Sequence, residues 1–241
     1  MREMTVSTGS STANRPNYVL EYWRAIEGDE VVVSRKVRKV YQKLADEILN
    51  PRDPWVFDNG KAHHAIDFIE GYCKHSKGKW GGQPLILELW QKALVAAVFG
   101  FVDKYAGLRR FTEVLLIVAR KNGKSTLAAA IGLYMMIADG EPGAEIYAAA
   151  TKEDQAKIIW KEARRMVRKS PALRKRVKCL VKEMVGLGRY EDSLFKPLGA
   201  DSDTLDGLNV HCALMDEIHA WKDKNLYDVI NDGTISREQP M

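Results

Sequence analysis

The segment 118–126, VARKNGKST, contains residue types that can bind the phosphate chain of a nucleotide. The backbone N–H groups of Asn122, Gly123 and Lys124 can point at phosphate oxygens, and a helix that begins at Lys124 would add its partial positive charge. The Lys124 ammonium can neutralise β- and γ-phosphates, and the Ser125 hydroxyl can bind Mg²⁺. The alternative is a basic turn that binds no ligand.

This loop departs from the usual phosphate-binding pattern, because Val118 stands where a glycine normally begins it. Arg120 supplies a second cation that can reach the γ-phosphate. The candidate nucleotide-binding residues of the loop are Lys121, Asn122, Gly123, Lys124, Ser125 and Thr126.

A second motif, ALMDEIHAW at 213–221, ends an apolar run with Asp216 and Glu217. Adjacent carboxylates at a strand end suit two tasks: Asp216 would organise Mg²⁺, and Glu217 would polarise the attacking water as a general base. The alternative is an acidic turn that starts a helix. Together with the first motif, the pair favours ATP hydrolysis, and Glu217 disfavours a small-molecule kinase, which takes its nucleophile from a substrate.

The elements that must position these motifs alternate between strand and helix. Short apolar runs predict buried strands, and longer amphipathic segments predict helices. The expected strands are 113–119, 144–150 and 210–216, and the expected helices are 124–138, 151–169 with Thr151 as N-cap, and 224–232. This alternation predicts an α/β fold of the P-loop type, with a mostly parallel sheet flanked by helices.

A smaller helical region is expected before the sheet. Gly28 is a plausible C-cap for a first helix, and Ser34 is a good N-cap for a second helix that stops before Pro51. Further helices are expected over 61–76 and 87–101, separated by the glycine-rich stretch 77–84. We therefore expect three regions: a flexible tail at 1–16, an N-terminal helical region at 17–80 and a P-loop ATPase domain at 81–241.

Composition limits the remaining possibilities. The chain has 241 residues, of which 46% are hydrophobic, enough for one sizeable core or a core with a small helical annex. The net charge of +5 makes a polyanionic partner plausible. The three cysteines lie far apart, which favours reduced thiols over a zinc site or a disulfide framework. No apolar run approaches the roughly 18–20 residues of a membrane span.

The combination of LELWQ, VARKNGKST, AAATKEDQA, DSDTLDGLNV and LMDEIHAW resembles the ATPase domain of the large terminase subunit of tailed bacteriophages, in its HK97-like branch. The resemblance implies a motor that hydrolyses ATP with Mg²⁺ and pumps double-stranded DNA through a portal into a procapsid. It also implies a portal protein and a small terminase subunit as partners, self-association into a ring, and action in the host cell cytoplasm without a membrane.

Residue by residue, the resemblance implies that Gln91 reads adenine and that Trp90, or more loosely Trp80, stacks on the base. The alternative for both tryptophans is ordinary packing. The resemblance also matches Lys124 and Ser125 to the phosphate and Mg²⁺ positions, and Asp216 and Glu217 to the metal-binding and catalytic carboxylates.

Two departures from the family pattern bear on the site. Asp206 stands where many large terminases carry an arginine that acts on a neighbouring subunit's ATP. Arg237 is the first replacement candidate and Arg120 the second, while the alternative for Arg237 is a solvated loop cation. The family's nuclease domain and next sheet strand would follow Met241, so we expect a truncated chain without nuclease activity.

Basic residues recur on one face of the expected helix 151–169, at Lys157, Lys161, Arg164, Arg165 and Arg168. They suit a surface that tracks DNA phosphates, and the alternative is a solvated helix face. His63, His64 and His75 are expected to be surface histidines, and His219 packs near the site. The rival functions are a helicase-like or repair ATPase and a non-hydrolysing DNA-binding assembly module.

Overall fold

The computed structural model describes residues 15–200 and 207–241. These residues form two compact units, one of 15–68 and 86–114 and the other of 69–85, 115–200 and 207–241. The boundaries between these two units differ from the domain boundary that the sequence predicts after residue 80. The boundaries of the functional regions therefore stay predictions. Most of the expected tail lies outside the described residues, although Arg15 donates two hydrogen bonds of 2.7 Å to Asp67.

The first unit is built around helices. Its helix α1 packs against α2 and α4, and its two short strands pair antiparallel. The helices and strands that begin in this unit are α1 (Tyr18–Glu27), α2 (Arg35–Leu49), β1 (Trp55–Phe57), α3 (Asn59–Tyr72), α4 (Leu89–Gly100) and β2 (Phe101–Asp103). Both predicted caps are confirmed, because the Gly28 N–H donates to Arg24 O at 2.8 Å and the Ser34 hydroxyl accepts from the Val37 N–H at 3.3 Å.

The second unit contains a five-stranded sheet in the order β4-β5-β6-β3-β7. Its strands are β3 (Glu145–Ala150), β4 (Val177–Cys179), β5 (Met184–Gly186), β6 (Leu194–Gly199) and β7 (Val210–Met215). Strands β6, β3 and β7 are parallel, whereas β4 and β5 add an antiparallel edge. The expected α/β fold with a mostly parallel core sheet is confirmed.

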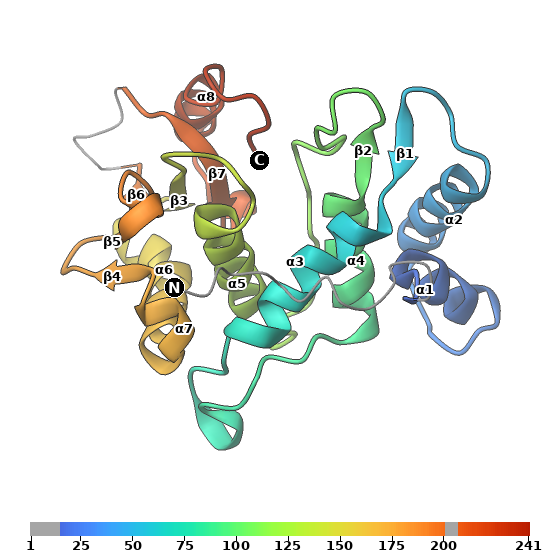
Figure 1. Cartoon of the computed structure of the whole chain (residues 1–241), viewed down its shortest axis with the longest axis horizontal. Coiled ribbons are helices and arrows are strands. Elements are labelled where there is room, and N and C mark those ends of the chain that lie inside the picture. Colours follow the sequence, from blue (N-terminus) through green and yellow to red (C-terminus); the bar gives the residue numbers. More distant parts are fainter. Residues whose placement is uncertain (1–14, 201–206) are drawn as a thin grey trace. The chain divides into compact units, whose positions relative to one another are not determined.

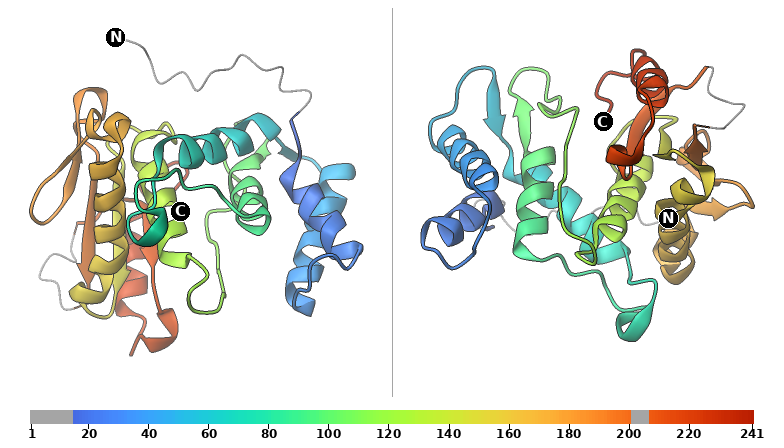
Figure 2. Two further views of the ribbon diagram at one scale, coloured as in Figure 1. Left: turned by 90° about the horizontal axis from the view of Figure 1, so that it is seen from below. Right: turned by 180° about the vertical axis from the view of Figure 1, so that it is seen from behind.

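The helices of the second unit lie on both faces of this sheet (Figure 1). They are α5 (Lys124–Ile137), α6 (Glu153–Lys169), α7 (Pro171–Arg174) and α8 (Asn225–Asp232), with single 3-10 turns at Gly78–Trp80, Gly188–Tyr190 and Ile218–Ala220. Helices α5 and α6 pack side by side (Figure 2) and cover β3, β6 and β7. Helix α8 contributes to an apolar cluster with Tyr147, Ala149 and Val210, so the two faces follow the alternation of side chains along β3.

Helix α5 approaches the sheet closely at Gly132. A Cβ atom there would lie 2.8 Å from Leu214 Cδ1 and 2.9 Å from Phe195 Cε1. A larger residue would therefore push α5 away from β6 and β7. The close packing holds the start of α5 at a fixed place relative to the end of β7.

The expected strand at 113–119 is wrong. Within the described residues, 113–119 have no regular secondary structure and join no β-ladder. Ile117 is 82% exposed, although its apolar run predicted burial on both faces of a sheet. A buried strand needs ladder partners as well as apolar side chains. The β7 edge instead bonds to Met241, whose N–H donates to His211 O at 2.8 Å and whose carbonyl accepts from the Ala213 N–H at 2.7 Å.

Helix α6 is amphipathic, as its sequence predicts. Its buried face includes Ala156, Ile159, Trp160, Ala163 and Met166, opposite the basic residues. The helix begins one residue later than expected, because Lys152 rather than Thr151 occupies the N-cap position. Among residues 15–200 and 207–241, no helix has both the length and the apolar character needed to cross a bilayer.

Candidate nucleotide-binding site

The phosphate loop bends tightly into α5. Lys121 and Gly123 have φ angles of 68° and 75°, in the left-handed region. Glycine adopts this conformation without a Cβ penalty, whereas a lysine there costs about 1 kcal/mol. The Asn122 side-chain amide donates to Ala119 O at 3.1 Å and closes the turn. The turn ends at the positive end of the α5 dipole, a location suited to an anion.

The carboxylate pair lies directly beyond β7. The Asp216 N–H donates to Ala149 O at 3.0 Å, so the pairing between β3 and β7 continues to this residue. Glu217 has a φ of 51°, uncommon for a residue with a side chain, and its N–H donates to Asp216 Oδ1 at 3.0 Å. The Trp221 indole N–H donates to Asp216 O at 3.1 Å and fixes the following turn.

The two motifs meet at the carboxyl end of the sheet. The Lys124 ammonium donates a hydrogen bond to Glu217 Oε1 and forms an ion pair with Asp216 Oδ1 at 3.1 Å. Lys124 is 31% exposed and Glu217 is 37% exposed, so both groups remain accessible to a ligand. Lys124 and Glu217 lie 93 positions apart in the chain, and only the packing of α5 on β7 brings them together.

This contact shifts two pKa values. The hydrogen bond from Lys124 is the main cause that lowers the pKa of Glu217, and the charges of His219 and Arg120 lower it further. The hydrogen bond to Glu217 is likewise the main cause that raises the pKa of Lys124. Near neutral pH the ammonium and the carboxylate are therefore both charged.

A cavity of about 250 Å³ lies at this meeting point. Its polar lining comprises Arg120, Lys124, Ser125, Gln155, Asp216 and Glu217. Five of these six were candidates from the sequence. Arg120 thus lies beside the groups expected to handle the terminal phosphate.

Gln155 is the lining residue that sequence reasoning missed. It lies in the first turn of α6, directly after β3, and its Oε1 accepts a hydrogen bond of 2.8 Å from the Thr151 hydroxyl. In sheets with parallel strands, ligands bind beyond the carboxyl ends of the strands. Since β3 was predicted, the polar residues that follow it could have been included on this topological ground.

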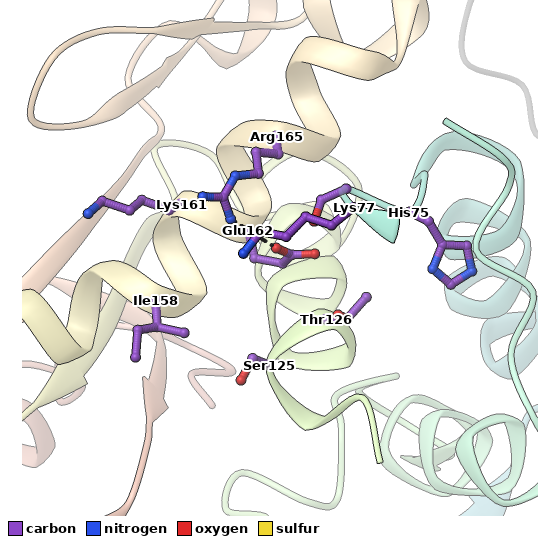
Figure 3. A pocket seen from close by; sticks show the side chains of 9 residues that line it. His75, Lys77, Ser125, Thr126, Ile158, Lys161, Glu162 and Arg165 are labelled. Carbon is purple, nitrogen blue, oxygen red and sulfur yellow. Dashed lines mark hydrogen bonds and ion pairs between the residues drawn. The ribbon is translucent and has the colours of Figure 1, made fainter. Parts of the chain in front are cut away.

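A second cavity, of about 420 Å³, lies on the other side of Ser125. It shares Ser125 and Ile158 with the first cavity. Figure 3 shows its walls, formed by the start of α5, by one face of α6 and by the segment at His75–Lys77. The two cavities therefore adjoin along the phosphate loop.

Arg237 lies away from this site. Its guanidinium forms an ion pair with Glu141 at 2.9 Å and donates to Gly143 O at 2.6 Å and Asn209 O at 3.2 Å. Gly143 and Asn209 precede β3 and β7, so this cluster lies at the amino end of the sheet. Arg237 is only 8% exposed. The geometry therefore does not fit a solvated cation, and the role of Arg237 as an arginine finger toward a neighbouring subunit's ATP stays a prediction.

Gln91 belongs to the first packing unit. Its Oε1 accepts from the Glu88 N–H at 2.9 Å, as part of a capping box at the start of α4. Trp90 is half-buried, and Trp80 is exposed. The roles of Gln91 and the tryptophans toward adenine stay predictions, and Asp206 lies outside the described residues.

The histidines divide between core and surface. His63 is buried, and its Nε2 lies 2.8 Å from Pro16 O, so its expected surface position is wrong. His75 lines the larger cavity, and His219 Nε2 lies 3.4 Å from Glu217 Oε2. No group of three or more potential metal ligands occurs among the described His, Cys, Asp and Glu residues.

The basic face of α6 is less uniform than its sequence suggests. Lys157 pairs with Glu153 at 2.8 Å, and the Arg164 guanidinium lies 5.1 Å from the centre of the Trp160 ring. Lys161 and Arg165 line the larger cavity. A continuous phosphate-tracking stripe therefore stays a prediction.

Residues 89–241 match the family model of the ATPase domain of the terminase large subunit. The terminase large subunit of Enterobacteria phage HK97 is 32% identical over 160 residues, covering 65% of this chain and 30% of that protein. The terminase large subunit of Lactococcus phage SK1 is 22% identical over 227 residues, covering 92% of this chain and 40% of that protein.

A solved structure is also similar. The crystal structure of the HK97 bacteriophage large terminase superposes with a TM-score of 0.64 at 29% identity, covering 75% of this chain and 36% of that one. The chain thus spans 30% to 40% of the length of the curated relatives that it matches.

Proposed function

The chain belongs to the ATPase-domain family of the terminase large subunit, and on that premise we propose that it is the Mg²⁺-dependent ATPase of a DNA-packaging motor. One observation carries the proposal. Lys124, at the start of α5, contacts Asp216 and Glu217 beyond β7, so the groups for phosphate binding, metal binding and water activation surround one cavity.

Binding of ATP begins with an exchange of ion-pair partners. The phosphates carry more negative charge than the two carboxylates and present several oxygens to the α5 N-terminus. Lys124 transfers from Glu217 to the β- and γ-phosphates, and this movement releases the Glu217 carboxylate. The ligand-free ion pair thus keeps the base neutralised until a triphosphate arrives.

The donor set around the cavity fits Mg²⁺. This ion is commonly held by one or two protein oxygens together with phosphate oxygens and water. The Ser125 hydroxyl and the Asp216 carboxylate line the same cavity and supply two such oxygens. When bound, the ion neutralises charge on the β- and γ-phosphates.

Glu217 acts as the general base in hydrolysis. Its carboxylate takes a proton from a water molecule while the water oxygen forms a bond to the γ-phosphorus, and the bond from that phosphorus to the bridging oxygen of ADP breaks. The products are ADP and inorganic phosphate. Arg120 stabilises charge on the transferring group from its place in the cavity lining. The positioning of Gln91 against adenine belongs to this proposal as well.

The proposed partners follow from the family. The motor would act on double-stranded DNA at a portal, with a small terminase subunit, as a ring in the host cell cytoplasm. The net charge of +5 is compatible with a nucleic-acid partner.

Phosphate release with and without Mg²⁺ tests the proposal. Glu217→Gln should lower the rate about 10²- to 10⁴-fold, because it removes the base but keeps the side-chain volume. ATP binding, measured by calorimetry, should persist, since the substitution also frees Lys124. The control is Glu191→Gln, an exposed acid before β6 that should leave the rate unchanged.

Three outcomes would redirect the assignment. Equal rates in the wild type and Glu217→Gln would remove Glu217 from the chemistry. A wild type with neither phosphate release nor nucleotide-dependent thermal stabilisation would indicate a non-hydrolysing DNA-binding module. Strand separation without any response to a portal or small subunit would indicate a helicase-like ATPase.

A further inference from the structure

We propose that the larger cavity beside the phosphate loop binds the ribose of the nucleotide, with the Glu162 carboxylate accepting a hydrogen bond from a ribose hydroxyl. The inference rests on the proposed binding of ATP and adds a sugar subsite to it. Its first support is position. The cavity of about 420 Å³ shares Ser125 and Ile158 with the smaller cavity that holds Lys124 and Asp216.

A ligand whose terminal phosphates sit at Lys124 is thereby directed toward the larger cavity. Ser125 and Thr126, at the start of α5, line this cavity together with residues of α6, so the ligand passes the start of α5 before it reaches α6. A volume of this size lies within the usual range for small-molecule sites. The part of ATP that follows the phosphates is its sugar.

One face of α6 forms the opposite wall. Ile158, Lys161, Glu162 and Arg165 have the spacing i, i+3, i+4 and i+7, which puts them on one side of a helix. Figure 3 shows the Arg165 side chain and the Lys77 side chain, which comes from the segment before Gly78–Trp80, both directed toward Glu162. Arg165 Nη1 lies 3.4 Å from Glu162 Oε2.

Glu162 is placed to accept further hydrogen bonds. Its side chain is only 12% exposed, yet its two oxygens offer about four acceptor positions. Among residues 15–200 and 207–241, its ion-pair partner is Arg165. The vicinal hydroxyls of a ribose are two donors, and a carboxylate is a suitable acceptor for them.

The same carboxylate argues against a DNA phosphate in this cavity. Lys77, Lys161 and Arg165 would attract a phosphodiester, but that group has no hydrogen-bond donor and would be repelled by Glu162. The hydroxyls of a ribose satisfy the carboxylate, and the cations are then available to the α-phosphate. The mixture of charges therefore fits a ribonucleotide better than a nucleic-acid backbone.

Calorimetric titration of the 241-residue protein with three ligands in Mg²⁺ tests the inference. The ligands are the β,γ-imido analogue of ATP, its 2′,3′-dideoxy form and inorganic tripolyphosphate. The wild type should bind the ribose form about tenfold more tightly than the dideoxy form, or better, because a hydrogen bond to a charged acceptor is lost in the latter. In Glu162→Ala this difference should vanish, while the affinity for tripolyphosphate stays the same.

Glu153→Ala is the matched control. It removes another acid from the same helix, one that pairs with Lys157 and lines neither cavity, and the preference for ribose should survive it. Glu162→Gln keeps the volume and one acceptor oxygen, so it should retain part of the preference.

Equal affinity of the wild type for the ribose and dideoxy forms would overturn the inference, and this measurement does not depend on how any variant folds. An unchanged ribose preference in Glu162→Ala, together with weakened binding of duplex DNA, would assign the cavity to DNA instead. Failure of the wild type to bind tripolyphosphate would contradict the phosphate site of the proposed function, so the two failures are distinguishable.

Discussion

The two ends of the central sheet use the same kinds of charged group in different ways. At the carboxyl end, Lys124 contacts Asp216 and Glu217. At the amino end, Arg237 pairs with Glu141, and His211 Nε2 lies 2.9 Å from Asp139 Oδ2. The Lys124 and Glu217 side chains are 31% and 37% exposed, whereas those of Arg237 and Asp139 are 8% and 4% exposed.

The interactions at the amino end of the sheet are structural. The Arg237 guanidinium donates to the carbonyls of Gly143, two residues before β3, and of Asn209, directly before β7. It therefore ties together the starts of two neighbouring strands. A ligand would have to replace an ion pair and several hydrogen bonds at once to displace this side chain.

At the carboxyl end of the sheet, Lys124 can exchange its ion-pair partners for a ligand. Its acceptors for Lys124 are two carboxylates rather than backbone carbonyls, and Lys121 and Glu217 both have positive φ. Strained residues of this kind persist where the surrounding structure holds them, and they occur often at functional sites. The difference teaches that an ion pair indicates a functional role when its groups remain accessible to a ligand. It indicates a structural role when its groups are buried and all their hydrogen-bonding positions are occupied.

The substitution Lys124→Ala is expected to give the largest effect, and it tests whether the carboxyl end of the sheet is functional rather than structural. We expect phosphate release to fall by at least about 10²-fold, because a preorganised cation for the phosphates is lost. The free energy of unfolding should change by less than about 1 kcal/mol, as for other partly exposed ion pairs. The readouts are phosphate release and urea denaturation, with Lys157→Ala as the control for loss of one lysine. A large loss of stability would make the carboxyl end structural as well.

Arg237→Ala should give the opposite pattern. It leaves Glu141 and two strand-start carbonyls without their donor, which should cost about 3 kcal/mol in the free energy of unfolding. The rate per folded molecule should change little. Urea denaturation and phosphate release again distinguish the outcomes, and Arg237→Lys should rescue little because an ammonium lacks the planar fork. A stable variant with a greatly reduced rate would instead support the expected catalytic arginine.

The smallest expected effect concerns the pKa of Glu217. Lys124 holds this pKa below its ordinary value of 4.5. The ion pair therefore contributes stability above about pH 4.5 and loses it as the pH falls through the lower pKa of the folded protein. In Lys124→Ala, and in the wild type with tripolyphosphate bound, the pKa should rise. Carbon-13 NMR of the Glu217 carboxyl group can follow this, and an identical midpoint in all three samples would contradict the exchange of partners.

Much of the fold could be predicted from local patterns. Apolar runs located β3 and β7, helical periodicity located α5 and α6, a glycine cap located the end of α1 and a serine cap located the start of α2. The two motifs also predicted that Lys124, Asp216 and Glu217 would serve one triphosphate, although the strand expected before the first motif joins no sheet among the described residues. These features depend on interactions within a few residues or on the rule that parallel strands end at one edge.

Other features could not be predicted, because they depend on distant partners. The apolar run at 113–119 has the composition of a strand, but composition does not specify a ladder partner. Arg237 has the same side chain as Arg120, and only the neighbouring carbonyls separate an anchor from a group beside a ligand. In the sequence, Gln155 and Glu162 look like ordinary polar residues of a helix. Only the packing of α6 beside α5 shows that they line the two cavities.

By itself, the sequence determined which segments form helices and strands and which side chains can handle a phosphate, because these properties are local. The tertiary structure alone decided which charges stay exposed at the carboxyl end and which are sealed at the amino end. The reason is that exposure and hydrogen-bond saturation are set by atoms from several segments packed together, and no single segment contains that information.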